Sequence, residues 1–327
     1  ISTAESVKPL WANVPKTISP EWGVFFSEKG KGREKPMPLP DDLEAWKAVQ
    51  VAIDEVKEAK ADEKAARFGM TYKESEIGGI PVVEVTPSEL ASTAKIAVYT
   101  HGGAYVLNSA KAVIESAMFF AAETGLRVIA VDYTLAPHSK WQETTDEIIE
   151  VFRALAEQGF TADNVVLYGD SAGGGLAAGV TLKMRDLGMV MPAALVLWSP
   201  WADITETGDT YLPLRDAEPY YTYEHVLGPA SLAYADADDH NNPYVSPVYG
   251  DFDMGFPPTL IQGGTKEIFL SNFVRLYQAL DQAGRTVKLD LYEGMPHVFV
   301  PTLPDSRESQ VAIAKVREWT EQYLLLK

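Results

Sequence analysis

The sequence predicts an α/β protein with a mainly parallel central sheet and helices on both of its faces. Strand and helix patterns alternate along residues 94–325, and this order produces such a sheet. The strand patterns are short apolar runs, typical of strands buried on both faces. The chain has 327 residues, of which 46% are hydrophobic and 23% charged, so it is long enough to form a substantial core.

The first 70 residues are predicted to form helix and loop. Residues 41–68 are rich in Ala, Glu and Lys, with apolar residues at helical spacing. The Pro-rich run at residues 36–40 precedes them, and such a run can start a helix but not continue one. We therefore treat residues 1–70 as an N-terminal segment distinct from the main domain at residues 71–327.

A hairpin and then a regular alternation follow. Residues 72–77 and 81–85 predict two strands joined at Gly78 and Gly79. The further strands and helices expected from the apolar pattern, in chain order, are strand 94–100, helix 112–124, strand 127–131, helix 141–158, strand 164–168, helix 171–187, strand 193–198, strand 259–262, helix 268–283, strand 286–292 and helix 307–325. Residues 201–253 interrupt the alternation and predict an inserted lid.

Composition excludes several classes of function. The 28 basic and 46 acidic residues give a formal net charge of −18, which repels nucleic acids and anionic membrane surfaces. The absence of cysteine excludes disulfides, thiolate metal sites and a cysteine nucleophile. No stretch has the roughly 18 uncharged apolar residues that a membrane span requires, so we expect a soluble protein without nucleic-acid partners.

The start of the sequence favours a cytoplasmic location. Residues 1–10 lack the basic stretch and apolar core of a secretion signal. The chain begins at Ile1 without a methionine, which leaves a signal already removed as the alternative. We therefore expect a cytoplasmic protein.

The motif Gly-Asp-Ser-Ala-Gly at residues 169–173 lies directly between a predicted strand and a predicted helix. A serine in such a tight turn holds its hydroxyl above the edge of the sheet, and the flanking glycines avoid a clash in the bend. The helix that begins at Ala172 directs unpaired N–H groups and its positive dipole end at the same point. We predict that Ser171 is a nucleophile; a purely structural glycine-rich turn is the alternative.

An activated serine requires a base, and the chain has five histidines. His297 lies in a loop directly after the last predicted strand, where its side chain would reach the carboxyl edge of the sheet beside Ser171. His225 and His240 fall in the insertion and His138 falls in a turn, which favours surface positions for these three. We predict that His297 is the base.

The base requires an acidic partner that orients its ring and stabilises the imidazolium. Glu267 follows the penultimate strand, and the chain order of serine, acid and histidine is known from one class of serine hydrolases. The competitors are Asp290, which lies within a strand, and Asp281, which lies within a helix. We predict that Glu267 is the acid; a charge that complements a helix dipole is the alternative.

His-Gly-Gly-Ala-Tyr at residues 101–105 follows a buried strand. Consecutive glycines let backbone N–H groups converge on one point, as the oxyanion of acyl transfer requires. The candidate donors come from this loop and from the helix after the serine: Gly102, Gly103, Ala104 and Ala172. Gly103, Ala104 and Ala172 are the main candidates, and we expect His101 to fix the loop.

Aromatic residues bracket these motifs along the sequence. Tyr105, Trp198 and Trp201 are candidates for lining a substrate pocket, ahead of the tyrosines at 220, 221 and 223. Plain core positions are the alternative, because aromatic residues at the ends of sheets are often buried.

The motifs together resemble the hormone-sensitive-lipase-like group of bacterial carboxylesterases, also called family IV, over roughly residues 70–325. The matching segments are His-Gly-Gly at 101–103, Asp-Tyr-Thr-Leu-Ala-Pro at 132–137, Gly-Asp-Ser-Ala-Gly-Gly at 169–174, Ser-Pro-Trp at 199–201 and Ser-Pro-Val-Tyr-Gly-Asp at 246–251. The departures from the group's common pattern are Ala104 for a third glycine, Thr134 for arginine and His138 for glutamate. The first position needs only a backbone N–H, and the other two lie in a structural loop.

The resemblance implies an α/β-hydrolase fold with a helical cap from the N-terminal segment, residues 1–70, and from an insertion at about 201–253. It implies a catalytic domain at residues 71–327 that hydrolyses short-chain carboxylic esters, and it suggests a homodimer. The expected reaction is two-step acyl transfer, which needs neither a metal ion nor an organic cofactor. An amidase or peptidase using the same residues, and a small-molecule receptor without catalysis, are the alternatives.

Overall fold

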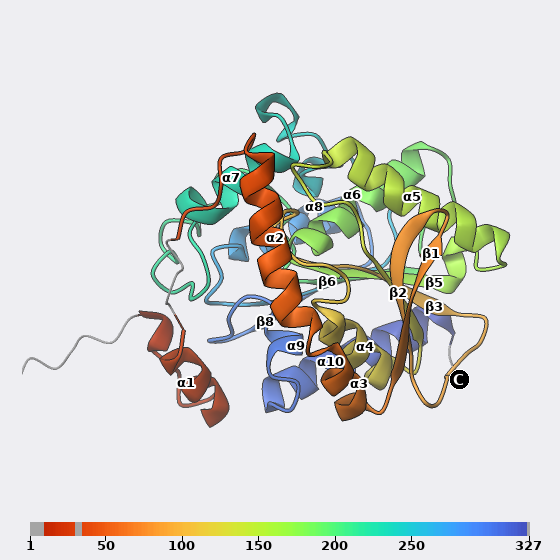
Figure 1. Cartoon of the computed structure of the whole chain (residues 1–327), viewed down its shortest axis with the longest axis horizontal. Coiled ribbons are helices and arrows are strands. Elements are labelled where there is room, and N and C mark those ends of the chain that lie inside the picture. Colours follow the sequence, from red (N-terminus) through yellow and green to blue (C-terminus); the bar gives the residue numbers. More distant parts are fainter. Residues whose placement is uncertain (1–9, 30–34, 326–327) are drawn as a thin grey trace, which may run out of the picture.

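An eight-stranded sheet runs through the molecule in the order β1-β2-β4-β3-β5-β6-β7-β8 (Figure 1). The structure is a computed structural model that describes residues 10–29 and 35–325. The strands are β1 Thr71–Ile77, β2 Ile80–Thr86, β3 Ile96–Thr100, β4 Arg127–Val131, β5 Val165–Asp170, β6 Ala194–Trp198, β7 Thr259–Gly264 and β8 Val287–Tyr292. The β1–β2 and β2–β4 pairs are antiparallel and every other pair is parallel, which confirms the predicted fold class.

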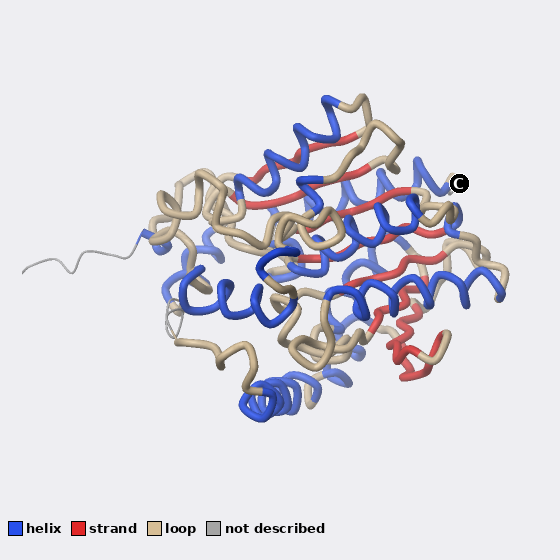
Figure 2. The backbone as a smooth tube through the Cα atoms, turned by 90° about the horizontal axis from the view of Figure 1, so that it is seen from above, coloured by secondary structure: helices blue, strands red, loops and turns tan. Residues whose placement is uncertain are grey.

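Helices cover both faces of the sheet, as Figure 2 shows. The apolar side chains of α5 (Trp141–Glu157), α6 (Ala172–Asp186) and α8 (Leu270–Gln282) form one core with one face. Those of α4 (Ile114–Thr124) and α10 (Arg307–Leu324) form a second core with the other face. Along β5, Leu167 faces the first core and its neighbour Tyr168 faces the second, because successive strand residues point to opposite faces.

Two helices occupy residues 41–68, the stretch in which the sequence places apolar residues at helical spacing. They are α2 (Leu43–Glu58) and α3 (Ala61–Phe68). Trp46 of α2 is buried in the core that contains α6, whereas Ala61 and Ala65 of α3 are buried in the core against α4. One straight helix would keep its apolar stripe on a single side, so the chain has to change direction to supply both cores.

The N-terminal segment is tied to the C-terminal part of the chain. Trp22 of α1 (Pro20–Ser27) is fully buried, and its ring centroid lies 6.4 Å from that of Phe299 in α9 (Phe299–Thr302). Ser19, which precedes α1, donates its hydroxyl to the carboxylate of Glu308 at 2.6 Å. Residues 1–9, on which the expectation about a secretion signal rests, lie outside the described residues.

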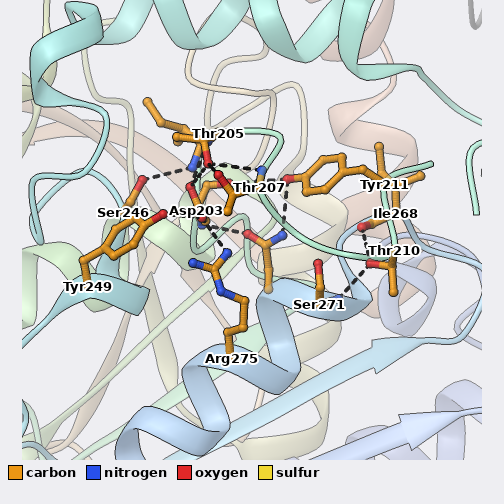
Figure 3. A network of polar contacts seen from close by, with 12 residues as sticks. Asp203, Thr205, Thr207, Thr210, Tyr211, Ser246, Tyr249, Ile268, Ser271 and Arg275 are labelled. Atoms are coloured by element: carbon orange, nitrogen blue, oxygen red, sulfur yellow. Dashed lines mark hydrogen bonds and ion pairs between the residues drawn. The ribbon is translucent and has the colours of Figure 1, made fainter. Parts of the chain in front are cut away.

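The insertion between β6 and β7 contains the helices η3 (Tyr223–Leu227) and α7 (Gly228–Tyr234). Its base is held by the buried Asp203 (Figure 3). The Asp203 carboxylate accepts hydrogen bonds from the Tyr249 hydroxyl at 3.0 Å and from the guanidinium of Arg275, which belongs to α8, at 2.5 Å. The start of the insertion is therefore fixed both to its own end and to the main domain.

The functional motifs gather at one edge of the sheet, because each follows the carboxyl end of a parallel strand. In spatial order, loop 101–105 follows β3, Ser171 follows β5, Ser199 follows β6, Glu267 follows β7 and His297 follows β8. The fold thus brings residues from five separate chain segments to a common edge.

No helix within residues 10–29 and 35–325 has the length and apolar character of a membrane span.

Helix α2 fastens the N-terminal segment to the chain just after loop 101–105. The buried side chain of Gln50 donates its amide to the carbonyls of Val106 at 3.0 Å and Ala136 at 3.1 Å. One helical turn further on, Asp54 accepts a hydrogen bond from the backbone N–H of Ser109 at 3.1 Å. This face of α2 thus satisfies two buried backbone carbonyls through Gln50 and one partly buried N–H through Asp54.

We expect Gln50→Leu to lower the free energy of unfolding by about 1–3 kcal/mol, because two buried carbonyls lose their donor. The measurement is the midpoint of urea unfolding at unchanged slope. Glu55→Leu is the matched control, since Glu55 is an exposed residue of the same helix and should change stability by no more than about 0.5 kcal/mol. Equal effects of the two substitutions would contradict the role given to Gln50.

Candidate active site

Ser171 occupies a strained turn between β5 and α6. Its backbone has φ 54° and ψ −124°, a region that side-chain-bearing residues rarely adopt. The turn is possible because Gly169 and Gly173 approach other backbone atoms closely: a Cβ on Gly169 would lie 2.3 Å from the carbonyl oxygen of Gly173, and a Cβ on Gly173 would lie 2.0 Å from that of Thr100. Any larger residue at either position would displace the backbone that holds Ser171.

His297 is paired with Glu267, as the sequence predicts. Nδ1 of His297 lies 2.7 Å from Oε2 of Glu267, whose side chain is fully buried. A carboxylate accepts hydrogen bonds, so in this contact Nδ1 is the donor and Nε2 is the ring nitrogen that Glu267 leaves available. The rings of Tyr221 and Phe269 pack edge-to-face with the imidazole of His297, each with a centroid-to-centroid distance of 5.2 Å, and restrict its orientation.

Ser199 holds this pair in place, a role that the sequence analysis missed. Its hydroxyl donates to Oε1 of Glu267 at 2.8 Å and accepts a hydrogen bond from the backbone N–H of Val298 at 3.0 Å. The same Glu267 oxygen accepts a bond from the N–H of Gly264 at 2.6 Å. Ser199 thereby connects the acid to the residue next to the histidine. The available signal was its position at the start of the Ser-Pro-Trp segment, directly after β6.

A cavity of about 460 Å³ contains both Ser171 and His297 in its wall. Its apolar lining comes mainly from α2, from the segment after loop 101–105, and from the insertion: Ile53, Leu107, Tyr220, Tyr221, Val226 and Leu227. The N-terminal segment and the insertion therefore both contribute walls to the cavity. Such a volume and lining are typical of a site for a small organic molecule.

Loop 101–105 presents its backbone to the cavity. Gly103 has φ 131° and Ala104 has φ 54°, and no acceptor among the described residues takes the N–H groups of Gly103, Ala104 or Ala172. Gly102 is different, because its N–H donates to Oδ1 of Asp170 at 3.2 Å. The prediction of Gly102 as an oxyanion donor is therefore wrong, since a carboxylate already occupies that N–H.

His101 has the expected place in fixing the loop. Its ring is fully buried and stacks on that of Tyr133 at a centroid distance of 4.3 Å. The hydroxyl of Tyr133 donates to the carbonyl oxygen of His101 at 2.6 Å. Burial lowers the pKa of His101, so the ring is held in its neutral form.

The prediction that Tyr105, Trp198 and Trp201 line the pocket is wrong. All three are fully buried and are absent from the cavity wall. Tyr105 stacks on Tyr234 of α7 at 3.7 Å, and the indole N–H of Trp198 donates to Gln262 at 3.0 Å, so both belong to the packing behind the site. The insertion instead directs its own aromatic residues, Tyr220 and Tyr221, into the cavity.

Asp290, the competing acid, lies within β8 as expected and has structural partners. Its carboxylate accepts hydrogen bonds from Gln262 at 3.0 Å and from the hydroxyl of Tyr292 at 2.8 Å, and it pairs with Lys315.

Within the described part of the chain, no group of three or more His, Asp or Glu side chains is arranged to hold a metal ion.

The parallel sheet, the nucleophile-type turn at Ser171 and the cavity at the carboxyl edge of the strands define an α/β hydrolase. Comparison with known proteins agrees: a family model described as "alpha/beta hydrolase fold" matches residues 97–301. The chain is 34% identical over 230 residues to an acetyl-hydrolase of Streptomyces hygroscopicus, covering 69% of this chain and 76% of that protein.

Solved structures narrow the assignment. The structure of esterase E25 superposes with a TM-score of 0.87 at 30% identity, covering 99% of this chain and 98% of that one. A hormone-sensitive lipase from a metagenome library superposes with a TM-score of 0.76 at 27% identity, and the match covers 89% of this chain and 99% of that one. The chain belongs to the α/β-hydrolase family, in its group of hormone-sensitive-lipase-like esterases, and it is a carboxylic ester hydrolase.

We expect Ser199→Ala to lower kcat for ester hydrolysis by about 10-fold with KM nearly unchanged, because the substitution removes a hydrogen bond that orients Glu267 without touching the cavity. Ser271→Ala is the matched control: this buried serine of α8 has no hydrogen-bond partner for its hydroxyl among the described residues. Steady-state kinetics on one ester compare the two. A Ser199→Ala enzyme with normal kcat would show that the contact with Glu267 is dispensable.

Proposed function

We propose that the chain is a serine carboxylesterase that hydrolyses short-chain esters through Ser171, His297 and Glu267. One observation carries this proposal: Ser171, held in its strained turn, and His297, hydrogen-bonded to the buried Glu267, face the same cavity. A serine, a base and an acid that orients the base are the groups that acyl transfer to serine requires.

In the first half of the reaction, Nε2 of His297 removes the proton of the Ser171 hydroxyl as Oγ attacks the ester carbonyl. Glu267 keeps the imidazole in the tautomer with Nδ1 protonated and stabilises the imidazolium that forms. His297 then gives the proton to the leaving alcohol, and the acyl group stays on Ser171. In the second half, His297 deprotonates a water molecule that attacks the acyl-enzyme carbonyl. The bond from that carbonyl to Oγ of Ser171 then breaks, His297 returns the proton to Oγ, and the carboxylic acid is released.

The oxyanion formed in each half receives the N–H groups of Gly103, Ala104 and Ala172. Support comes from the absence of other acceptors for these groups in the described residues. Gly103 and Ala104 also line the cavity, and Ala172 directly follows the lining residue Ser171. The start of α6 adds the positive end of its dipole at Ala172. A single donor of this kind contributes about 3 kcal/mol to stabilisation of the transition state.

Cavity size and similarity support a preference for short acyl chains. The cavity, at about 460 Å³, is bounded by bulky side chains from both cap segments: Ile53 from the N-terminal segment, and Tyr220 and Tyr221 from the insertion. The named relative from Streptomyces is an acetyl-hydrolase. A p-nitrophenyl ester series from acetyl to palmitoyl measures the preference, and kcat/KM is expected to be highest for chains of a few carbons.

Ser171→Ala is expected to lower ester turnover by about 10⁴-fold or more, because the nucleophile is lost while no core volume changes. The measurement is kcat on p-nitrophenyl butyrate, with the circular dichroism spectrum as the test of folding. A folded variant that retains more than about a tenth of the activity would show that another residue is the nucleophile.

Glu267→Gln is expected to lower kcat by about 10²–10⁴-fold with little change in KM, because the amide preserves shape but can select the wrong imidazole tautomer. Asp290→Asn is the matched control, since Asp290 is a carboxylate on the adjacent strand with structural partners and should leave kcat within a factor of a few. A severe loss in Asp290→Asn together with near-normal Glu267→Gln would assign the acid to the other strand.

A further inference from the structure

A second cavity, of about 680 Å³, lies beside the catalytic one and is lined by lysines. Lys57 of α2, Lys60 in the turn after α2, Lys64 of α3 and Lys29 after α1 all line it. We call this cavity the lysine groove. Four ammonium groups face two carboxylates there, whereas the whole chain has 28 basic and 46 acidic residues. The groove is thus a local reversal of the charge of an acidic protein.

The two carboxylates of the lysine groove already have partners. Glu115 pairs with Arg67 at 2.9 Å and lies 3.7 Å from Lys64. Asp170 accepts hydrogen bonds from the hydroxyl of Tyr99 and the backbone N–H of Gly102, and burial raises its pKa. Neither carboxylate therefore neutralises the groove as a whole.

The lysine groove is continuous with the catalytic cavity. Lys57, Asp170, Val298 and Thr302 line both cavities, and two of these residues are direct neighbours of Ser171 and His297 in the chain. Lys57 is partly buried at this junction, where its ammonium donates to the side-chain carbonyl of Asn108 at 2.5 Å. A molecule bound at Ser171 can therefore extend toward the lysines.

Lys29 reaches the same junction from the other side. Its ammonium lies 4.5 Å from the ring centroid of Phe25 and 5.5 Å from that of Tyr220, which also lines the catalytic cavity. Aromatic faces hold a cation by electrostatic attraction while leaving its hydrogen-bond donors available to a ligand. The wall residue Tyr220 thus connects the catalytic cavity to a positively charged side chain.

We propose that the lysine groove is an anion-binding subsite that selects esters carrying a carboxylate away from the scissile bond, such as half-esters of dicarboxylic acids. The inference rests on the proposed function, because the anion is part of the substrate of Ser171. Lys29, Lys57 and Lys64 are half-buried, and partly desolvated ammonium groups attract a carboxylate more strongly than surface lysines do. In an enzyme with a net charge of −18 that lacked such a subsite, the same carboxylate would weaken binding.

The test compares two p-nitrophenyl esters of equal chain length, mono-p-nitrophenyl suberate, which has a terminal carboxylate, and neutral p-nitrophenyl octanoate. The measured quantity is the ratio of kcat/KM for the suberate to that for the octanoate. For the wild-type chain we expect a ratio of at least about 3 at low ionic strength, falling toward one in 1 M salt, where the Debye length is about 3 Å. A ratio below one at low salt would overturn the proposal.

Variants locate the effect in the groove. Lys60→Gln combined with Lys64→Gln should lower the suberate-to-octanoate ratio by about 3- to 10-fold, as expected for the loss of one exposed and one half-buried charge. Lys47→Gln is the matched control, since Lys47 is an exposed lysine of α2 that does not line the groove, and it should leave the ratio unchanged. An unchanged ratio in the double variant overturns the proposal, and the exposed Lys60→Gln alone provides the same test if the double variant does not fold.

Failure of this inference is distinguishable from failure of the proposed function. Turnover of the neutral octanoate, or of p-nitrophenyl butyrate, depends on Ser171 and not on the lysines. If neutral esters are hydrolysed by the wild type and lost in Ser171→Ala, the proposed function holds whatever the ratio is. If the neutral esters are not hydrolysed at all, the proposed function itself fails.

Discussion

The turn at Ser171 is the constraint on which the rest of the site depends. The chain leaves a buried parallel strand and enters a helix within one residue, so Ser171 adopts a positive φ and the backbones of β5, α6 and β3 come into direct contact. Only glycine fits at positions 169 and 173, which accounts for the glycine pattern of the motif. Strain of this kind persists because the surrounding sheet and helix hold the turn on both sides.

The remaining functional groups are placed relative to that turn by the order of the strands. The parallel strands β3, β5, β6, β7 and β8 each deliver a functional segment to the same edge, and hydrogen bonds between the loops then fix its position. Ser199, after β6, bonds both to Glu267 after β7 and to the backbone beside His297 after β8. Glu267 and His297 are therefore aligned by a third loop. Helix α2 secures the segment that follows loop 101–105 through Gln50 and Asp54.

The sequence predicted those parts of the structure that depend on local pattern. Alternating apolar runs predict the sheet, and Ser171, Glu267 and His297 could be chosen because each lies in the segment that follows a predicted strand. The break between α2 and α3 could not be predicted from local pattern, because it depends on tertiary contacts: the two helices pack against different cores. The lining of the cavity depends on the path of the insertion, so Tyr220 and Tyr221 took the place expected for the buried Trp201. Gly102 failed as a donor because a neighbouring carboxylate already accepts its N–H.

The most direct test of the account is covalent trapping of the nucleophile. The protein is incubated with diethyl p-nitrophenyl phosphate, whose phosphorus is attacked by activated serine hydroxyls, and the adduct is located by peptide mass spectrometry. The account predicts release of about one equivalent of p-nitrophenolate, loss of esterase activity in parallel, and one diethyl phosphoryl group on Ser171. Inactivation with the label on another residue and Ser171 unmodified would contradict it.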